Sequence, residues 1–148
     1  IIVKELADLH NAEILATDVD GQVLQQARKG VYSPNEVKSL PPELRERYFR
    51  EEKGCYYLLP EIKDGVVFQR HNLLLDPFPT GLDLILCRNV VIYFTEEAKD
   101  ELYYKFHRSL RDGGYLLVGG TEPLLSYMQL GFETVRYSFY KKVAAAKP

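Results

Sequence analysis

The sequence contains no tryptophan, one methionine and only two cysteines among its 148 residues. Two cysteines cannot form a disulfide framework, and Cys55 and Cys87 lack the C-x-x-C spacing of a zinc or redox motif. The three histidines are scattered, so the sequence predicts no metal site. Cys87 closes an apolar run and is interpreted as a small buried hydrophobe. A reducing compartment, the cytoplasm, is the predicted location.

Strong net charge and long apolar runs are also missing. The formal net charge is -2 and the pI is about 6.0, so nothing points to nucleic acid as a partner. No apolar run is long enough to cross a bilayer, which predicts no membrane insertion. A G-x-S-x-G elbow is absent, and no cysteine has a histidine nearby in sequence, so the sequence offers no arrangement for nucleophilic catalysis.

What the chain does have is an alternation of helix-like and strand-like segments. Residues 13–17 predict a strand, and Gly21–Lys29 predicts a helix that Asp20 caps and Gly30 ends. Leu82–Cys87 is nearly all apolar, as expected of a strand buried on both faces of a parallel sheet. A starting helix is expected within residues 1–10.

The second half continues the alternation. Thr95 caps the clearest helix of the sequence, and Gly113–Gly114 is expected to end it. Tyr115–Val118 predicts a further strand, Glu122–Gln129 a short helix, and Phe132–Lys142 an antiparallel edge hairpin. The predicted fold class is therefore α/β, a doubly wound sheet with antiparallel strands at its C-terminal end.

An insertion lies between the predicted helix Gly21–Lys29 and the predicted strand Leu82–Cys87. Pro42–Phe49 predicts a helix, and Cys55–Leu59 and Val66–Gln69 predict a small antiparallel ribbon, with its second strand a candidate for the main sheet. We expect one domain over residues 1–142, with an inserted β-subdomain at about residues 50–70 and a disordered tail at 143–148.

Polar side chains follow the strands where an open α/β sheet binds its ligand. Asp18 follows the first strand and can accept hydrogen bonds from both ribose hydroxyls, whereas Asp20 is better explained as a helix cap. Asn72 follows Val66–Gln69 and can pair with an adenine edge, although such a residue is often only a turn residue. Tyr93 is a candidate pocket wall with core packing as its alternative.

These residues occur in blocks that resemble the CheR chemotaxis methyltransferases. The blocks appear in that family's order and at about its spacing, and they are Ala16–Asp20, Val23–Leu24, Ala27–Tyr32, Arg47–Phe49, Asn72–Leu73, Phe78, Cys87–Phe94 and Gly113–Leu116. The block Cys87–Phe94 is highly specific. The resemblance implies a Rossmann-like sheet that binds S-adenosylmethionine, whose product is S-adenosylhomocysteine.

The resemblance also implies roles for individual residues. Asp18 would hold the ribose, and Asn72 would pair with adenine with help from the Leu73 backbone. Asn89 and Val90 would line the methionine side of the cofactor pocket.

Two further residues of the Cys87–Phe94 block are the implied catalytic candidates. Tyr93 would stand near the transferred methyl and the incoming glutamate, and Arg88 lies in the same motif with a role that is catalytic or structural. The methyl would pass to glutamate carboxylates of methyl-accepting chemoreceptors, the implied partners. Alignment of two bound reactants needs no protein nucleophile.

The sequence lacks parts that the family has, and these differences lead to further predictions. The family's N-terminal helical domain and first strand are absent, so the chain is expected to be a fragment. A sheet without its central strand has two open edges, which predicts poor cofactor binding and self-association. Two alternatives remain: a non-catalytic sensor or scaffold domain, favoured by Thr121 where the family has His-Ser, and a small-molecule methyltransferase on the same fold.

Overall fold

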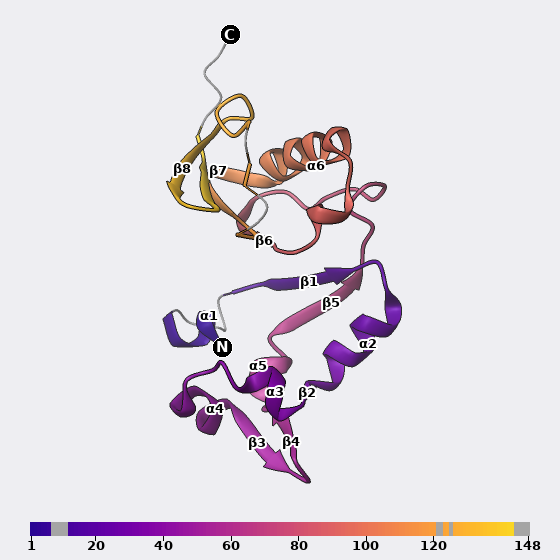
Figure 1. Cartoon of the computed structure of the whole chain (residues 1–148), viewed down its shortest axis with the longest axis vertical. Coiled ribbons are helices and arrows are strands. Elements are labelled where there is room, and N and C mark those ends of the chain that lie inside the picture. Colours follow the sequence, from indigo (N-terminus) through magenta and orange to yellow (C-terminus); the bar gives the residue numbers. More distant parts are fainter. Residues whose placement is uncertain (7–11, 121–122, 125, 144–148) are drawn as a thin grey trace. The chain divides into compact units, whose positions relative to one another are not determined.

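The computed structural model describes residues 1–6, 12–120, 123–124 and 126–143. The chain divides into two compact units, Ile1–Asn72 and Leu73–Pro148 (Figure 1). Helices and strands alternate along both, so the α/β fold class predicted from the sequence is confirmed. None of the described helices has the length and apolar character needed to pass through a membrane.

Unit 1 contains a parallel pair of strands, β1 (Ile14–Asp18) and β5 (Val66–Arg70). Helix α2 (Gly21–Lys29) packs against both. Its ends follow the prediction, because the Asp20 side chain accepts from the Gln22 N–H, and Gly30 takes the left-handed conformation at the C-terminus. The starting helix α1 spans Ile2–Leu6, and the rest of its predicted range lies outside the described residues.

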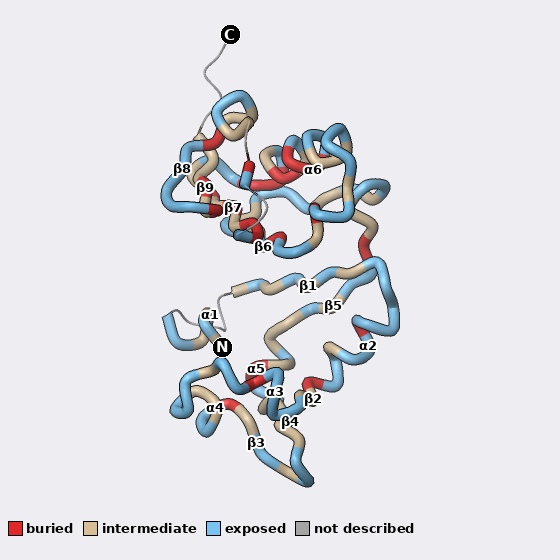
Figure 2. The backbone as a smooth tube through the Cα atoms, viewed as in Figure 1, coloured by how far each residue is buried: buried red, intermediate tan, exposed pale blue. Residues whose placement is uncertain are grey.

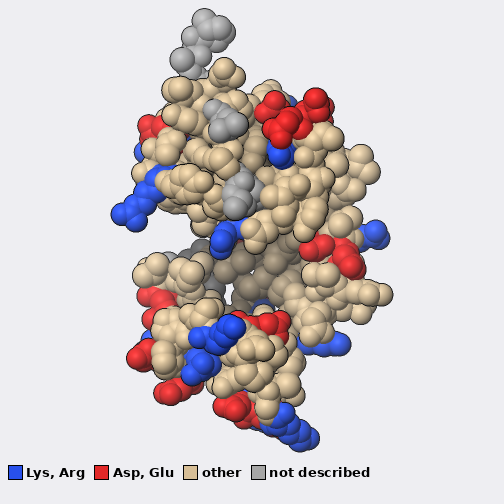
Figure 3. Space-filling model, viewed as in Figure 1, with Lys and Arg blue, Asp and Glu red and all other residues tan. Residues whose placement is uncertain are grey.

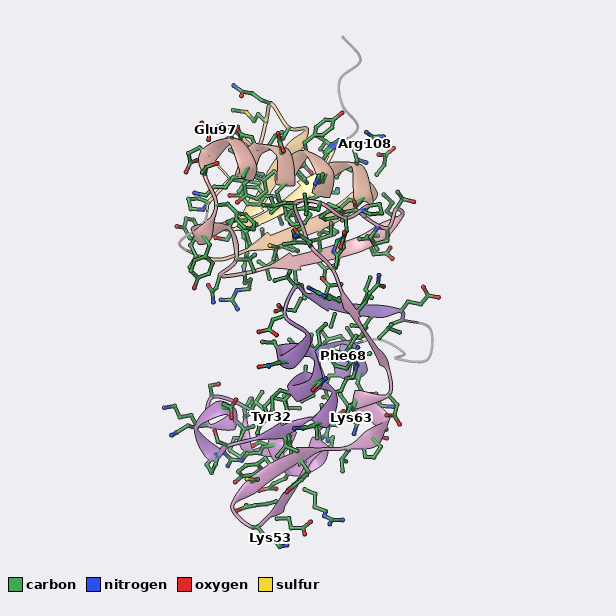
Figure 4. The ribbon with its side chains drawn as sticks, turned by 90° about the vertical axis from the view of Figure 1, so that its right-hand side faces the viewer. Tyr32, Lys53, Lys63, Phe68, Glu97 and Arg108 are labelled. Carbon is green, nitrogen blue, oxygen red and sulfur yellow. The ribbon has the colours of Figure 1, made fainter. Side chains whose placement is uncertain are left out.

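A second sheet of unit 1 has the strand order β2-β4-β3, formed by Val31–Tyr32, Cys55–Leu58 and Phe49–Glu52. The predicted ribbon between β4 and β5 is therefore wrong. Strand β3 is the antiparallel partner of β4, joined to it by a turn at Lys53 and Gly54 with positive φ angles (Lys53 is labelled in Figure 4). The charged sequence of β3 lacks the apolar alternation that marks strands.

Aromatic contacts explain why β3 forms. The Phe49 ring lies edge-on to Tyr32 of β2, with ring centroids 5.8 Å apart, and edge-on to Tyr56 of β4 at 6.5 Å. Such contacts across strands stabilise a sheet that sequence alternation alone does not predict.

The remaining helices of unit 1 are short, and each starts with proline at its first turn: α3 (Pro34–Val37), α4 (Pro42–Tyr48) and α5 (Pro60–Lys63).

Unit 2 is built on one sheet with the strand order β6-β7-β9-β8. These strands span Leu82–Cys87, Leu110–Val118, Phe139–Lys142 and Phe132–Arg136. β6 and β7 are parallel, whereas β9 is antiparallel to both β7 and β8. The predicted edge hairpin is confirmed. The predicted helix Glu122–Gln129 is not found, since its described C-terminal part consists of turns.

Helix α6 (Glu96–Ser109) packs on this sheet. Thr95 caps it as predicted, accepting a hydrogen bond from the Ala98 N–H. Backbone and Thr95 hydrogen bonds at this end lower the pKa of Glu97. Glu97 and Arg108 lie near opposite ends of the helix in Figure 4, so each charge complements the helix dipole.

The expected end of α6 at Gly113–Gly114 is wrong. The helix ends at Ser109, and Leu110 already has the extended conformation that starts β7. Gly114 lies inside that strand, where an added Cβ would come within 3.0 Å of the Leu82 carbonyl oxygen. The glycine thus permits the close approach of β6 and β7 at a register shift, a need that the sequence does not distinguish from a helix stop.

The core of unit 2 lies on one side of its sheet. Figure 2 shows buried residues on α6 and β7, and Leu102, Phe106 and Leu116 are almost fully inaccessible. The prediction that β6 is buried on both faces is wrong, because Leu84 is 47% exposed and Leu86 65% exposed. Strand alternation places Tyr115, Leu117 and Phe139 on that same side. These five residues are called the open face.

Candidate functional site

Asp18 ends β1 and is held by the chain that follows it. Its Oδ1 accepts a hydrogen bond from the Asp20 N–H at 2.8 Å, and the Asp20 carboxylate in turn accepts from the Gln22 N–H at 2.7 Å. Each carboxylate therefore accepts a hydrogen bond from the backbone N–H two residues further along the chain. Asp20 caps α2, whereas Asp18 forms an Asx turn at the carboxyl end of the strand.

The parallel register of β1 and β5 brings the next candidate to the same end. Asp18 pairs with Arg70, and the His71 N–H donates to the Asp18 carbonyl oxygen at 3.0 Å. Asn72 follows directly and is half-buried, like Asp18. Unit 1 thus places a carboxylate and an amide beyond the carboxyl ends of two adjacent parallel strands.

Arg70 is a residue of this region that the sequence did not single out. Its Nε donates to the Val19 carbonyl oxygen at 3.0 Å, which ties the turn after Asp18 to β5. The contact spans 51 positions and depends on the parallel register, so no local pattern indicates it.

In unit 2 the Cys87–Phe94 block follows the same principle at the end of β6. Cys87 is buried in the core, whereas Arg88 and Asn89 are exposed. Asn89 has a φ of 58°, a left-handed conformation that asparagine tolerates better than most residues. The chain bends here at the strand end, and Val90 then packs against the core.

Tyr93 ends a short 3₁₀ helix, η2 (Val91–Tyr93). Val91 anchors this turn, being 1% exposed, and Phe94 packs against the same core. Tyr93 is 80% exposed, so the core-packing alternative for its ring does not hold.

The seven predicted site residues fall into two groups. Unit 1 holds Asp18 and Asn72 at one sheet end. Unit 2 holds the other five, of which four lie in the continuous segment 88–93 and the fifth is Leu73. The side chains of Leu73 and Val90 pack against the same core cluster. Within the described ranges, no three His, Cys, Asp or Glu side chains are grouped to hold a metal ion.

The distribution of charged side chains on the face drawn in Figure 3 indicates no second candidate binding site. On this face of the molecule, basic and acidic side chains are interspersed over the surface. Some of the described ion pairs are exposed on both sides, for example Arg50–Glu52 and Arg111–Asp83. Such exposed pairs contribute little stability.

Comparison with solved structures identifies the fold. A TehB-like SAM-dependent methyltransferase from Corynebacterium glutamicum superposes with a TM-score of 0.50 at 14% identity, covering 87% of this chain and 65% of that one. This similarity supports the Rossmann-like methyltransferase sheet expected from the sequence.

Sequence comparison then identifies the family. Residues 1–140 match the family model described as "CheR methyltransferase, SAM binding domain". The chain is 39% identical over 142 residues to a chemotaxis protein methyltransferase of Listeria innocua and 42% identical over 130 residues to that of Listeria monocytogenes. These alignments cover 96% and 88% of the chain, but 54% and 50% of the relatives. The chain belongs to the CheR methyltransferase family and spans about half the length of these relatives.

Proposed function

We propose that this chain is the cofactor-binding part of an enzyme that transfers a methyl group from S-adenosylmethionine to glutamate side chains of bacterial chemoreceptors. The match of residues 1–140 to the family's SAM-binding domain is the observation that carries the proposal. The reaction belongs in the cytoplasm, in agreement with the two free cysteines, Cys55 and Cys87.

In this proposal the cofactor is held by groups at the strand ends. The Asp18 carboxylate accepts hydrogen bonds from the ribose hydroxyls while its Oδ1 keeps the Asp20 N–H. Asn72 and the Leu73 backbone bind the adenine edge, since an amide both donates and accepts. Asn89 and Val90 line the methionine side.

Tyr93 and Arg88 are proposed to act on the acceptor side. A glutamate carboxylate oxygen attacks the methyl carbon in line with the carbon–sulfur bond, and that bond's electron pair stays on sulfur. The products are a methyl ester and S-adenosylhomocysteine. Positive charge on sulfur and negative charge on the carboxylate cancel, so no proton has to move. Tyr93, with its exposed ring, orients the incoming carboxylate, and Arg88 supplies positive charge beside it.

The test uses the natural polypeptide that carries this sequence, chemoreceptor-containing membranes and S-adenosylmethionine labelled in its methyl group. We expect base-labile label, the property of a methyl ester, to appear on the receptor. Asp18→Ala should weaken the binding of S-adenosylhomocysteine by about tenfold or more, because a charge-assisted hydrogen-bond acceptor is lost.

Asp20→Ala is the matched control, since it removes a neighbouring carboxylate that only caps α2. This variant should lose stability by about 1 kcal/mol and keep its affinity. Equal affinity in the Asp18→Ala variant and the unsubstituted protein would contradict the proposed pocket. Binding without methyl ester formation would instead support a non-catalytic sensor domain, and methylation of a small molecule alone would support a different substrate class.

A further inference from the structure

We infer that Lys105 is a positioning residue for the cofactor: it holds the Leu73 backbone in the conformation that the adenine contact requires. The inference rests on the proposed function, in which Leu73 helps to bind adenine. No sequence motif points to Lys105, which lies on α6 between the exposed Tyr104 and the buried Phe106.

The Lys105 side chain connects α6 to residues 73–78, the segment that follows β5. The Lys105 Nζ donates hydrogen bonds to the carbonyl oxygens of Leu73, at 3.2 Å, and Leu74, at 2.5 Å. It also lies 5.8 Å from the centroid of the Phe78 ring. Lys105 is half-buried, so its stem follows the protein surface while the ammonium group reaches the two carbonyls.

Apolar contacts secure the same segment. The Phe78 ring packs edge-on against Phe106 of α6, with centroids 5.7 Å apart, and the Leu73 side chain packs against the core of unit 2. Residues 73–78 are thus attached to one helix and its core by a side chain at each end and by an ammonium group near the start. The polar contact is the one that acts directly on the backbone.

This contact determines how Leu73 can present itself to a ligand. A hydrogen bond on its carbonyl oxygen fixes the peptide plane after Leu73, and the packing of its half-buried side chain against the core restricts the Cα–Cβ direction. Together they restrict the orientation of the peptide group before it, which carries the Leu73 N–H. A segment ordered before binding loses less conformational entropy when the ligand arrives, and this preserves affinity.

The test compares Lys105→Met with Lys105→Arg in the natural polypeptide. Methionine keeps most of the stem over Phe78 but removes the donors, whereas arginine retains donors for the two carbonyls. Lys99→Met is the matched control, because Lys99 lies on the same helix and pairs with Glu96 at 2.7 Å, away from the Leu73 segment. Calorimetry measures the affinity for S-adenosylhomocysteine and for adenosine, and circular dichroism follows unfolding.

We expect Lys105→Met to weaken both ligands by a similar factor, about tenfold, since the contact serves the nucleoside half that they share. The KM for S-adenosylmethionine should rise while kcat at saturation stays unchanged. Lys105→Arg should recover most of the affinity. Unchanged affinity in Lys105→Met, or an equal loss in Lys99→Met, would overturn the inference. If the unsubstituted protein binds neither ligand, the proposed function itself fails and the inference with it.

Discussion

At the scale of single residues, Gly131 illustrates a requirement for glycine outside the proposed site. Its φ is 77°, and an added Cβ would lie 2.7 Å from the Nε2 of His107 on α6. His107 has little room to move, because its ring packs edge-on against Phe132. Burial of the ring, followed by the nearby Lys142 charge, lowers the pKa of His107. We expect Gly131→Ala to lower the free energy of unfolding by roughly 1–3 kcal/mol, measured by urea denaturation.

Gly21→Ala is the control for this prediction. Gly21 begins α2, and an added Cβ there meets nothing within 4 Å. Alanine favours helix over glycine by roughly 0.5–1 kcal/mol, so this variant should be neutral or slightly more stable. A Gly131→Ala variant as stable as the unsubstituted protein would contradict the steric argument.

Residues with local tasks could be predicted from the sequence, and residues with distant partners could not. Asp20 and Thr95 were recognised because a helix cap depends on neighbours within three positions. Arg70 and Lys105 were missed, since their partners lie 51 and 31 or 32 positions away and depend on strand register and helix packing. Tyr93 was a candidate from its place after the Leu82–Cys87 strand and from the family motif, and only the structure shows its exposure.

At the scale of elements, Glu5 joins α1 to α4. Its carboxylate accepts hydrogen bonds from the Tyr48 hydroxyl and from Arg47 at 2.8 Å, and Tyr48 then Arg47 lower the pKa of Glu5. Because the folded-state pKa lies below the ordinary value of 4.5, the stabilisation is fully present above that value. It is lost as the pH falls through the folded-state pKa.

The expected outcome is a weaker acid dependence in Glu5→Gln. Urea unfolding at about pH 7 and about pH 3.5 should show a smaller stability difference in this variant than in the unsubstituted protein. Glu43→Gln, on the exposed part of α4, should retain the original difference. Identical pH dependence in all three proteins would show that the Glu5 contact does not stabilise the fold.

Most elements were foreseen, and those that were not share a physical cause. The apolar run of β6 and the capped start of α6 are strong local signals. The charged strand β3 and the early end of α6 are set by partners, namely the aromatic rings of β2 and β4 and the pairing of Leu110 with Leu82. Tertiary pairing decides such segments where local preference is weak.

At the scale of the whole molecule, the sheets expose strand edges. In the described part of the chain, β1 pairs with β5 and β6 pairs with β7, each on one side. Unpaired N–H and C=O groups along an edge favour pairing with another chain. We therefore expect residues 1–148, prepared alone, to self-associate in light scattering and to bind S-adenosylhomocysteine weakly in calorimetry.

A charge placed beside the edge should oppose this association. Leu86→Lys should raise the fraction of monomer, because a charged side chain next to an open edge disfavours pairing with a second copy. Tyr104→Lys changes a residue of α6 that is 55% exposed and should leave the association unchanged. Micromolar binding of S-adenosylhomocysteine by a monomer of residues 1–148 would refute the hypothesis.

The open face of unit 2 has a practical consequence for anyone who follows the unfolding of this chain. Its Tyr115 and Phe139 rings stack with centroids 5.2 Å apart beside the exposed Leu84 and Leu86, a surface to which we expect fluorescent apolar dyes to adsorb. Dye fluorescence will therefore be bright before heating begins, and a thermal-shift curve will start from a raised baseline. With eleven tyrosines and no tryptophan, intrinsic tyrosine emission reports the melting transition directly.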